Sequence, residues 1–169
     1  MFHANSKFAS VNVSVLETPD GQGSMVTVFT SFSVDILREE QRIEVFIPKT
    51  EDPEKYVIKI YQSKVETCKT NKVPSRYVNT VQENFSTSSN FNYSCPIPKN
   101  FLIKITNLTI TDKFMPPMPI EQNFRFNIKF FGMIKEQTGW VFLYNQSYFG
   151  RYKKWNHQNF RYTQPETSS

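Results

Sequence analysis

The sequence predicts an all-β fold, an immunoglobulin-like antiparallel β-sandwich with one short helical excursion. About seven segments alternate apolar and polar residues with a period of two, which is typical of half-buried strands. Turn-forming residues separate these segments, as in a sandwich of short strands. Only one segment changes to the spacing of a helix, so a mainly helical fold is excluded.

Four of the expected strands precede the first cysteine. Alternation predicts strands at Phe8–Leu16, Met25–Leu37 and Arg42–Ile47, and we expect these three to form a meander. The fourth strand, Lys55–Gln62, follows the polar stretch Pro48–Glu54. Because that stretch holds two prolines and three acids, we expect a surface loop there.

The segment between the two cysteines contains the expected helix. Its apolar residues recur at i, i+3 and i+7, as on one helical face. They are Val78, Val81 and Phe85. The pair Pro74-Ser75 suits a first helical turn. The stretch Asn84–Ser94 is rich in Ser and Asn and predicts a loop.

Three strands are expected after the second cysteine. They are Phe101–Ile110, Asn123–Phe131 and Trp140–Phe149. In the first, alternation places Lys104 and Thr106 outside, yet an exposed glycosylation sequon at Asn107 needs the opposite parity. We therefore expect a bend or a β-bulge near Thr106. The following link, Met115–Pro119, has three prolines and cannot be a central strand.

The last two strands predict an inward wall of large apolar side chains. If Asn145 is exposed, the aromatic residues of its strand point inward and join those of the preceding strand. The expected wall is Phe124, Phe126, Ile128, Phe130, Trp140, Phe142, Tyr144 and Tyr148. Such a wall is more commonly part of a filled core, whereas a ligand cavity is the alternative.

Length and composition favour one domain without a membrane span. The 169 residues suffice for a real core, which we place at residues 1–155, followed by a polar tail at 156–169. The 16 Phe, 8 Tyr and 2 Trp concentrate apolar area in large rings. A net charge of +5 predicts weak attraction to anionic surfaces. No run of 18 apolar residues is present.

Catalytic, metal and nucleic-acid functions find little support. The only histidines, His3 and His157, have no cysteine or acid at a ligand spacing, so neither a metal site nor a cofactor is predicted. The sequence has no nucleophile elbow or phosphate-binding glycine loop, so we do not expect an enzyme. Arg151–Trp155 mixes basic and aromatic residues, but such a short cluster is more often a solvated strand end, and no nucleic-acid partner is expected.

Cysteines and sequons favour secretion. Cys68 and Cys95 either form a disulfide, as in most secreted chains, or remain two reduced thiols of a cytosolic protein. Residues Met1–Asn5 lack the basic and apolar regions of a signal peptide. We nevertheless expect a secreted protein whose start codon is misplaced or whose signal was removed. The expected glycosylation sites are Asn12, Asn84, Asn92, Asn107 and Asn145.

The order of features in the later part of the chain carries a resemblance. A Cys, an amphipathic stretch, the pair Cys95-Pro96, a strand at Phe101–Ile105, a proline-rich link and an aromatic strand pair follow one another. This order resembles an insect family of secreted proteins related to the ML, or lipid-recognition, domains and to the chemosensory A and B proteins. The resemblance implies a Cys68–Cys95 disulfide and two sheets splayed enough to admit a lipid.

Two functional hypotheses follow. The resemblance implies a secreted, monomeric, non-enzymatic binding protein for a lipid or other hydrophobic small molecule, acting in insect contact-pheromone or taste detection, with a membrane receptor as a further partner. The wall residues from Phe124 to Tyr144 would line the site, and Val78, Val81 and Phe85 would cover its mouth. The alternative is an extracellular protein-interaction module with a filled core. Its contact surface would be Phe29, Phe46 and Tyr61.

Overall fold

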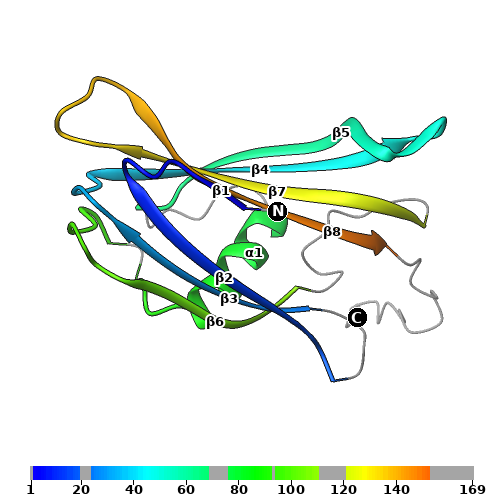
Figure 1. The fold of residues 1–169 in the computed structure, drawn as a ribbon, viewed down its shortest axis with the longest axis horizontal. Coiled ribbons are helices and arrows are strands. Elements are labelled where there is room, and N and C mark those ends of the chain that lie inside the picture. Colours follow the sequence, from blue (N-terminus) through cyan, green and yellow to red (C-terminus); the bar gives the residue numbers. More distant parts are fainter. Residues whose placement is uncertain (1, 20–23, 69–75, 93, 111–120, 153–169) are drawn as a thin grey trace, which may run out of the picture.

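The computed structural model describes residues 2–19, 24–68, 76–92, 94–110 and 121–152, which form eight strands and one helix (Figure 1). The strands are β1 (Phe2–Ala4), β2 (Ala9–Glu17), β3 (Ser24–Phe32), β4 (Arg38–Lys49), β5 (Asp52–Glu66), β6 (Ile103–Ile110), β7 (Gln122–Met133) and β8 (Trp140–Tyr152). The helix is α1 (Arg76–Thr87). The expected tail at 156–169 and the proline-rich link lie outside the described residues.

Two antiparallel sheets make up the fold. The five-stranded sheet has the order β1-β8-β7-β4-β5, and the three-stranded sheet has the order β2-β3-β6 (Figure 1). This arrangement confirms the prediction of an all-β antiparallel sandwich with one short helix. No described helix has the length and apolar character needed to cross a membrane.

The expected three-strand meander is wrong. β2 pairs with β3, but β4 pairs with β5 and β7 in the other sheet. After Phe32 the chain crosses between the layers, and the backbone N–H of Leu37 donates to the carbonyl of Met133 in β7 at 2.8 Å. Alternation identifies the buried face of a strand, but it does not identify the partner strand.

Several boundaries also differ from expectation. The stretch 48–54 is not a loop, because β4 and β5 continue through it on both sides of a short turn. Pro53 is tolerated since β5 is an edge strand, where one side of the backbone needs no partner. Helix α1 extends to Thr87, into the stretch expected as a loop. Strand β3 ends at Phe32 instead of Leu37.

The irregularity expected near Thr106 is confirmed, and it is a bulge. Val28 pairs with Ile105 and Val26 pairs with Leu108, so Thr106 and Asn107 together oppose Thr27. Asn107 has a φ of 54°, a left-handed conformation that Asn adopts more readily than most residues. Its side chain is exposed, as the parity argument required.

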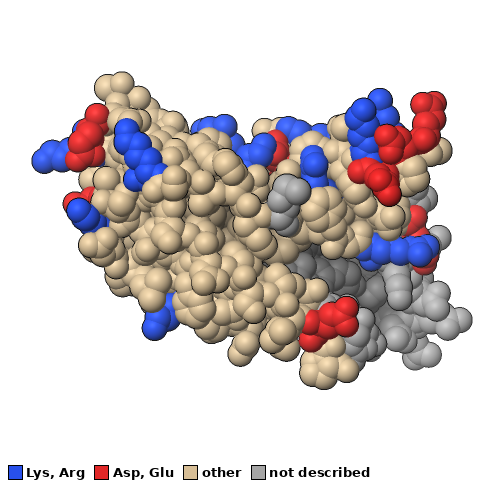
Figure 2. Space-filling view, viewed as in Figure 1, with Lys and Arg blue, Asp and Glu red and all other residues tan. Residues whose placement is uncertain are grey.

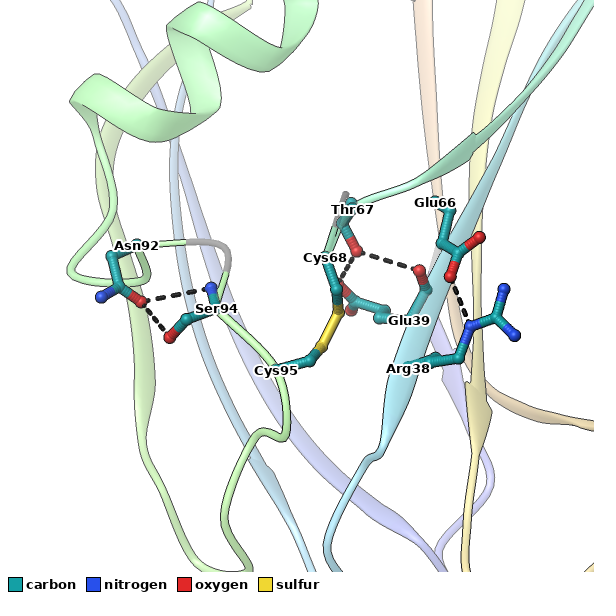
Figure 3. Close-up of a disulfide and its surroundings, with 8 residues drawn as sticks. All are labelled: Arg38, Glu39, Glu66, Thr67, Cys68, Asn92, Ser94 and Cys95. Carbon is teal, nitrogen blue, oxygen red and sulfur yellow. Dashed lines mark hydrogen bonds and ion pairs between the residues drawn. A yellow bond between two sulfur atoms is a disulfide. The ribbon is translucent and has the colours of Figure 1, made fainter. Parts of the chain in front are cut away.

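The disulfide between Cys68 and Cys95 is present, and it ties the end of β5 to the segment that leads toward β6 (Figure 3). The two Cα atoms are 5.5 Å apart and the cysteines are 27 residues apart in sequence. Two residues beyond Cys95, the backbone of Ile97 exchanges hydrogen bonds of 2.9 and 2.8 Å with Ile36. The two connections lie at one end of the sandwich and hold its layers together there.

Replacing both cysteines with serine should lower the free energy of unfolding by about 3 kcal/mol, because the disulfide restricts the unfolded chain. Urea unfolding of the oxidised wild type and the Cys68→Ser/Cys95→Ser variant would measure the difference. Equal stabilities would contradict a structural role for the bond.

Candidate functional site

The inward wall of β7 forms as the sequence predicted. Phe124, Phe126, Ile128 and Phe130 are all buried and belong to one hydrophobic cluster with residues of β3 and β4. The Phe124 ring lies against Gly150 of β8, where an added Cβ would come within 2.6 Å of the ring. A glycine at this position is therefore what allows Phe124 to lie across the neighbouring strand.

In β8, two of the predicted wall residues face the wrong way. Phe130 pairs with Tyr144 and Phe131 pairs with Phe142, which leaves Leu143 as an extra residue in a bulge. Leu143 and Tyr144 are both buried in the core. Because a bulge reverses the alternation, every residue of β8 before Leu143 has the opposite parity from the one expected.

Phe142 and Trp140 consequently lie on the outer side of the five-stranded sheet. The Phe142 ring is 5.9 Å from His3 and 5.8 Å from Phe131, centroid to centroid. The Arg38 guanidinium is 5.6 Å from the Trp140 ring. The uninterrupted apolar run from Val141 to Tyr144 was the one sign that parity could not be assigned here.

Aromatic rings connect the two sheets across the interior. Phe130 and Tyr144 stack with ring centroids 4.1 Å apart and an interplanar angle of 14°. Phe32, which comes from β3 in the opposite sheet, lies 6.5 Å from Tyr144. Nearby, Phe126 and Tyr148 are 6.2 Å apart. Tyr148 is half-buried and packs against the core, as expected for an inward residue.

A polar side chain that the sequence analysis missed lies among these rings. Gln146 of β8 is 0% exposed, and its Oε1 accepts a hydrogen bond from the Tyr148 hydroxyl at 2.7 Å. Its Nε2 has no hydrogen-bond partner. Burial raises the pKa of Tyr148, so its hydroxyl remains a donor at neutral pH. The alternation of β8 marked this position as inward, but a buried glutamine has no sequence signature.

The opposite sheet contributes a second unpartnered atom. Thr30 of β3 is buried, and its Oγ1 has no hydrogen-bond partner. Phe32 contacts Tyr144, and β3 and β8 run in opposite senses (Figure 1). Thr30 lies two residues before Phe32, and Gln146 lies two residues after Tyr144. Both side chains therefore face the same part of the interior. An unsatisfied buried polar group costs about 1–3 kcal/mol.

The predicted mouth of the site is described only in part. Phe85 of α1 is buried in the main core, so it packs inside the sandwich. The side chains of Val78 and Val81 lie outside the described residues.

Two surface hollows are present elsewhere, one of about 430 Å³ beside Phe91 and Phe101 and one of about 210 Å³ at Asp35. None of the wall residues lines either hollow.

The contact surface expected for an interaction module does not assemble. Phe29 is exposed on the outer side of the three-stranded sheet, opposite Asn12 and Lys104. Phe46 lies on the outer side of the other sheet, beneath Arg125. Tyr61 packs against the main core. Three side chains on different layers cannot form one surface.

The five sequons differ in exposure. Asn12, Asn92 and Asn107 are exposed, whereas Asn84 and Asn145 are partly buried. The Asn92 Oδ1 accepts hydrogen bonds from the backbone N–H and the hydroxyl of Ser94 (Figure 3).

The described part of the chain contains no group of three His, Cys, Asp or Glu side chains placed to hold a metal ion.

A buried carboxyl lies beside the disulfide. Glu39 is 2% exposed, and its Oε2 accepts a hydrogen bond of 2.6 Å from the Thr67 hydroxyl (Figure 3). Burial raises the pKa of Glu39 from 4.5 to about 7, although the Thr67 hydrogen bond opposes this change. Sequence alternation does not reveal this group, because it predicts a strand only from Arg42, whereas β4 begins at Arg38.

Glu39 should make the protein less stable as the pH rises. Below pH 4.5 the carboxyl is protonated in both states, and above pH 7 ionisation costs the folded state about 3 kcal/mol. Urea unfolding at pH 5 and pH 8 should therefore give a lower stability at pH 8. Glu39→Gln should flatten this decline, and Glu136→Gln, at an exposed position, should preserve it. An unchanged decline in Glu39→Gln would contradict the assignment.

The fold and its interior define a class, an antiparallel β-sandwich with one disulfide and an aromatic-rich core between its sheets. Residues 41–128 match a family described as "Protein of unknown function (DUF1091)". The match covers more than half of the chain, so the chain belongs to this family. The matched segment runs from β4 into β7 and includes both cysteines. No curated protein and no solved structure matches the chain.

Proposed function

We propose that the protein is a non-enzymatic binding protein for a lipid or another hydrophobic small molecule held between the two sheets. The observation that carries the proposal is the unpartnered Nε2 of Gln146 within an aromatic interior. Binding sites for small molecules combine mostly apolar walls with a few polar groups that orient the ligand. Gln146 and Thr30 would be these groups.

The energetics favour an apolar ligand with one polar end. Removing apolar ligand surface from water contributes about 25 cal/mol per Å². An acceptor oxygen on the ligand would also satisfy the Gln146 Nε2, whose unpaired state costs free energy. The proposed ligand therefore carries a carbonyl or hydroxyl oxygen and a long hydrocarbon part.

Entry of the ligand requires the sheets to separate, and the fold suggests where. The disulfide and the Ile36–Ile97 bridge hold one end. At the other end, the described strand ends β2–β3 and β4–β5 belong to different sheets and are joined by no described bridge or disulfide (Figure 1). There Leu16 is 63% exposed and Ile58 is also exposed. We place the entrance at this end.

The proposed setting is extracellular. The disulfide is of a kind that persists in oxidising compartments, and the exposed sequons are compatible with glycosylation. The resemblance to insect chemosensory A and B proteins supports a role in contact-pheromone or taste detection. In that role the protein would act as a secreted monomer that presents its ligand to a membrane receptor.

Native mass spectrometry of the protein secreted from insect cells, before and after organic extraction, tests the proposal. We expect a discrete, extractable mass of a few hundred daltons, the size of ligand that such a site accommodates. A mass that stays ligand-free when the protein is challenged with a lipid panel would contradict the proposal. It would favour the alternative, an extracellular interaction module with a filled core.

Gln146→Leu should remove the preference for oxygen-containing ligands. The wild type should bind a long-chain ketone or ester more tightly than the alkane of equal length, by roughly fivefold to tenfold for one hydrogen bond. In the variant the two ligands should bind alike, as measured by displacement of a fluorescent fatty acid. Gln137→Leu, at an exposed position, should retain the preference. A preference that survives in folded Gln146→Leu would refute the role of this side chain.

A further inference from the structure

The outer side of the five-stranded sheet, here called the outer face, carries an excess of positive charge. Register places the charged residues of β4, β5, β7 and β8 opposite one another on this side. The basic residues are Arg42, Lys59, Lys64, Arg125, Lys129 and Arg151. They outnumber the glutamates on this side, Glu40, Glu44 and Glu54, by three, and Arg38 and Glu66 form a separate neutral pair. In Figure 2, most of the visible Lys and Arg lie along the upper part of the molecule, over this sheet, and a group of Asp and Glu accompanies them at the upper right.

The first glutamate does not neutralise its neighbours. Glu40 accepts hydrogen bonds from Arg42 and from Lys64, each at 2.7 Å. Burial alone would raise the pKa of Glu40, but the hydrogen bonds and charges of Lys64 and Arg42 outweigh it and lower the pKa. One ionised carboxylate thus holds two cations and leaves one positive charge in surplus.

The second glutamate repeats this arrangement. Glu44 pairs with Lys59 and with Lys129, each at 2.6 Å. Its burial is again outweighed by the two lysines, which lower its pKa. The two trios are fixed in place by short ion pairs, and each presents a net positive charge to solvent.

Arg125 is different, because it has no carboxylate partner in the described part of the chain. Its guanidinium lies 4.6 Å from the centroid of the Phe46 ring, and its Nε is buried without a hydrogen-bond partner. Its register partner in β8 is Phe149, which is 54% exposed. Phe149 also contacts Tyr56, with ring centroids 5.4 Å apart. A partly buried guanidinium, with an unpartnered Nε, therefore lies beside an exposed aromatic ring.

We propose that the outer face docks onto an anionic lipid membrane, with Arg125 binding a lipid phosphate and Phe149 entering the headgroup region. No described helix or strand lies over this face (Figure 1). Basic residues near an anionic bilayer contribute favourable binding, and aromatic rings are enriched at the membrane–water interface. A second copy of the chain would present the same positive excess and be repelled.

Vesicle co-sedimentation of the full chain tests docking. The protein should bind vesicles of phosphatidylcholine with phosphatidylserine, should bind phosphatidylcholine alone weakly, and should release as salt increases. Arg125→Gln/Arg151→Gln should weaken binding to the mixed vesicles by roughly 30-fold. The matched variant Lys99→Gln/Lys104→Gln has the same net charge, but its exposed changes lie off the outer face, and it should lose less than threefold.

Several results would overturn the docking proposal. Equal losses in the two double variants would mean a response to net charge alone. Tight binding to heparin without binding to vesicles would indicate a polyanionic partner instead of a membrane. Phe149→Ser should weaken vesicle binding at constant charge, and an unchanged affinity would remove the ring from the site. Arg125→Gln/Arg151→Gln should keep any extractable ligand, so this result separates docking from the ligand proposal.

Discussion

The pairing of β4 with β7 at the centre of the five-stranded sheet is the constraint on which the rest of the structure depends. Ile43 lies opposite Ile128 and Val45 lies opposite Phe126, and all four are buried. The intervening residues of both strands face the other way, where lysines and arginines hold the two glutamates. One register thus produces the apolar interior and the charged outer face together, since side chains alternate along a strand.

The interior combines close aromatic packing with unpaired polar atoms. A fully apolar interior would have no reason to bury a glutamine, and a fully satisfied network would leave no donor free. This interior fits neither description, because Gln146 and Thr30 are buried and each has an unpartnered polar atom. These atoms are the physical basis for proposing a ligand with a polar oxygen. The disulfide and the neighbouring bridge hold the layers together at one end.

The two proposals concern opposite sides of the same sheet and are connected through it. Ligand binding would depend on the inward side chains of β7 and β8, whereas membrane docking would depend on the outward side chains of the same strands. A carrier of hydrophobic molecules has to exchange them with a lipid phase or a receptor in a membrane. A basic, aromatic outer face would bring the interior close to that surface without changing its chemistry.

The sequence by itself determined most strands, the inward set of β7 and the irregularity at Thr106 and Asn107, because alternation and sequon parity are local properties. It also located the helix and, through resemblance, the disulfide. Only the tertiary structure decided the parity of β8, where the continuous apolar run around Leu143 allowed either orientation. It alone decided that β4 leaves the β2–β3 pair and that Glu39 and Gln146 are buried. These outcomes depend on contacts between residues far apart in the chain, which a local pattern does not encode.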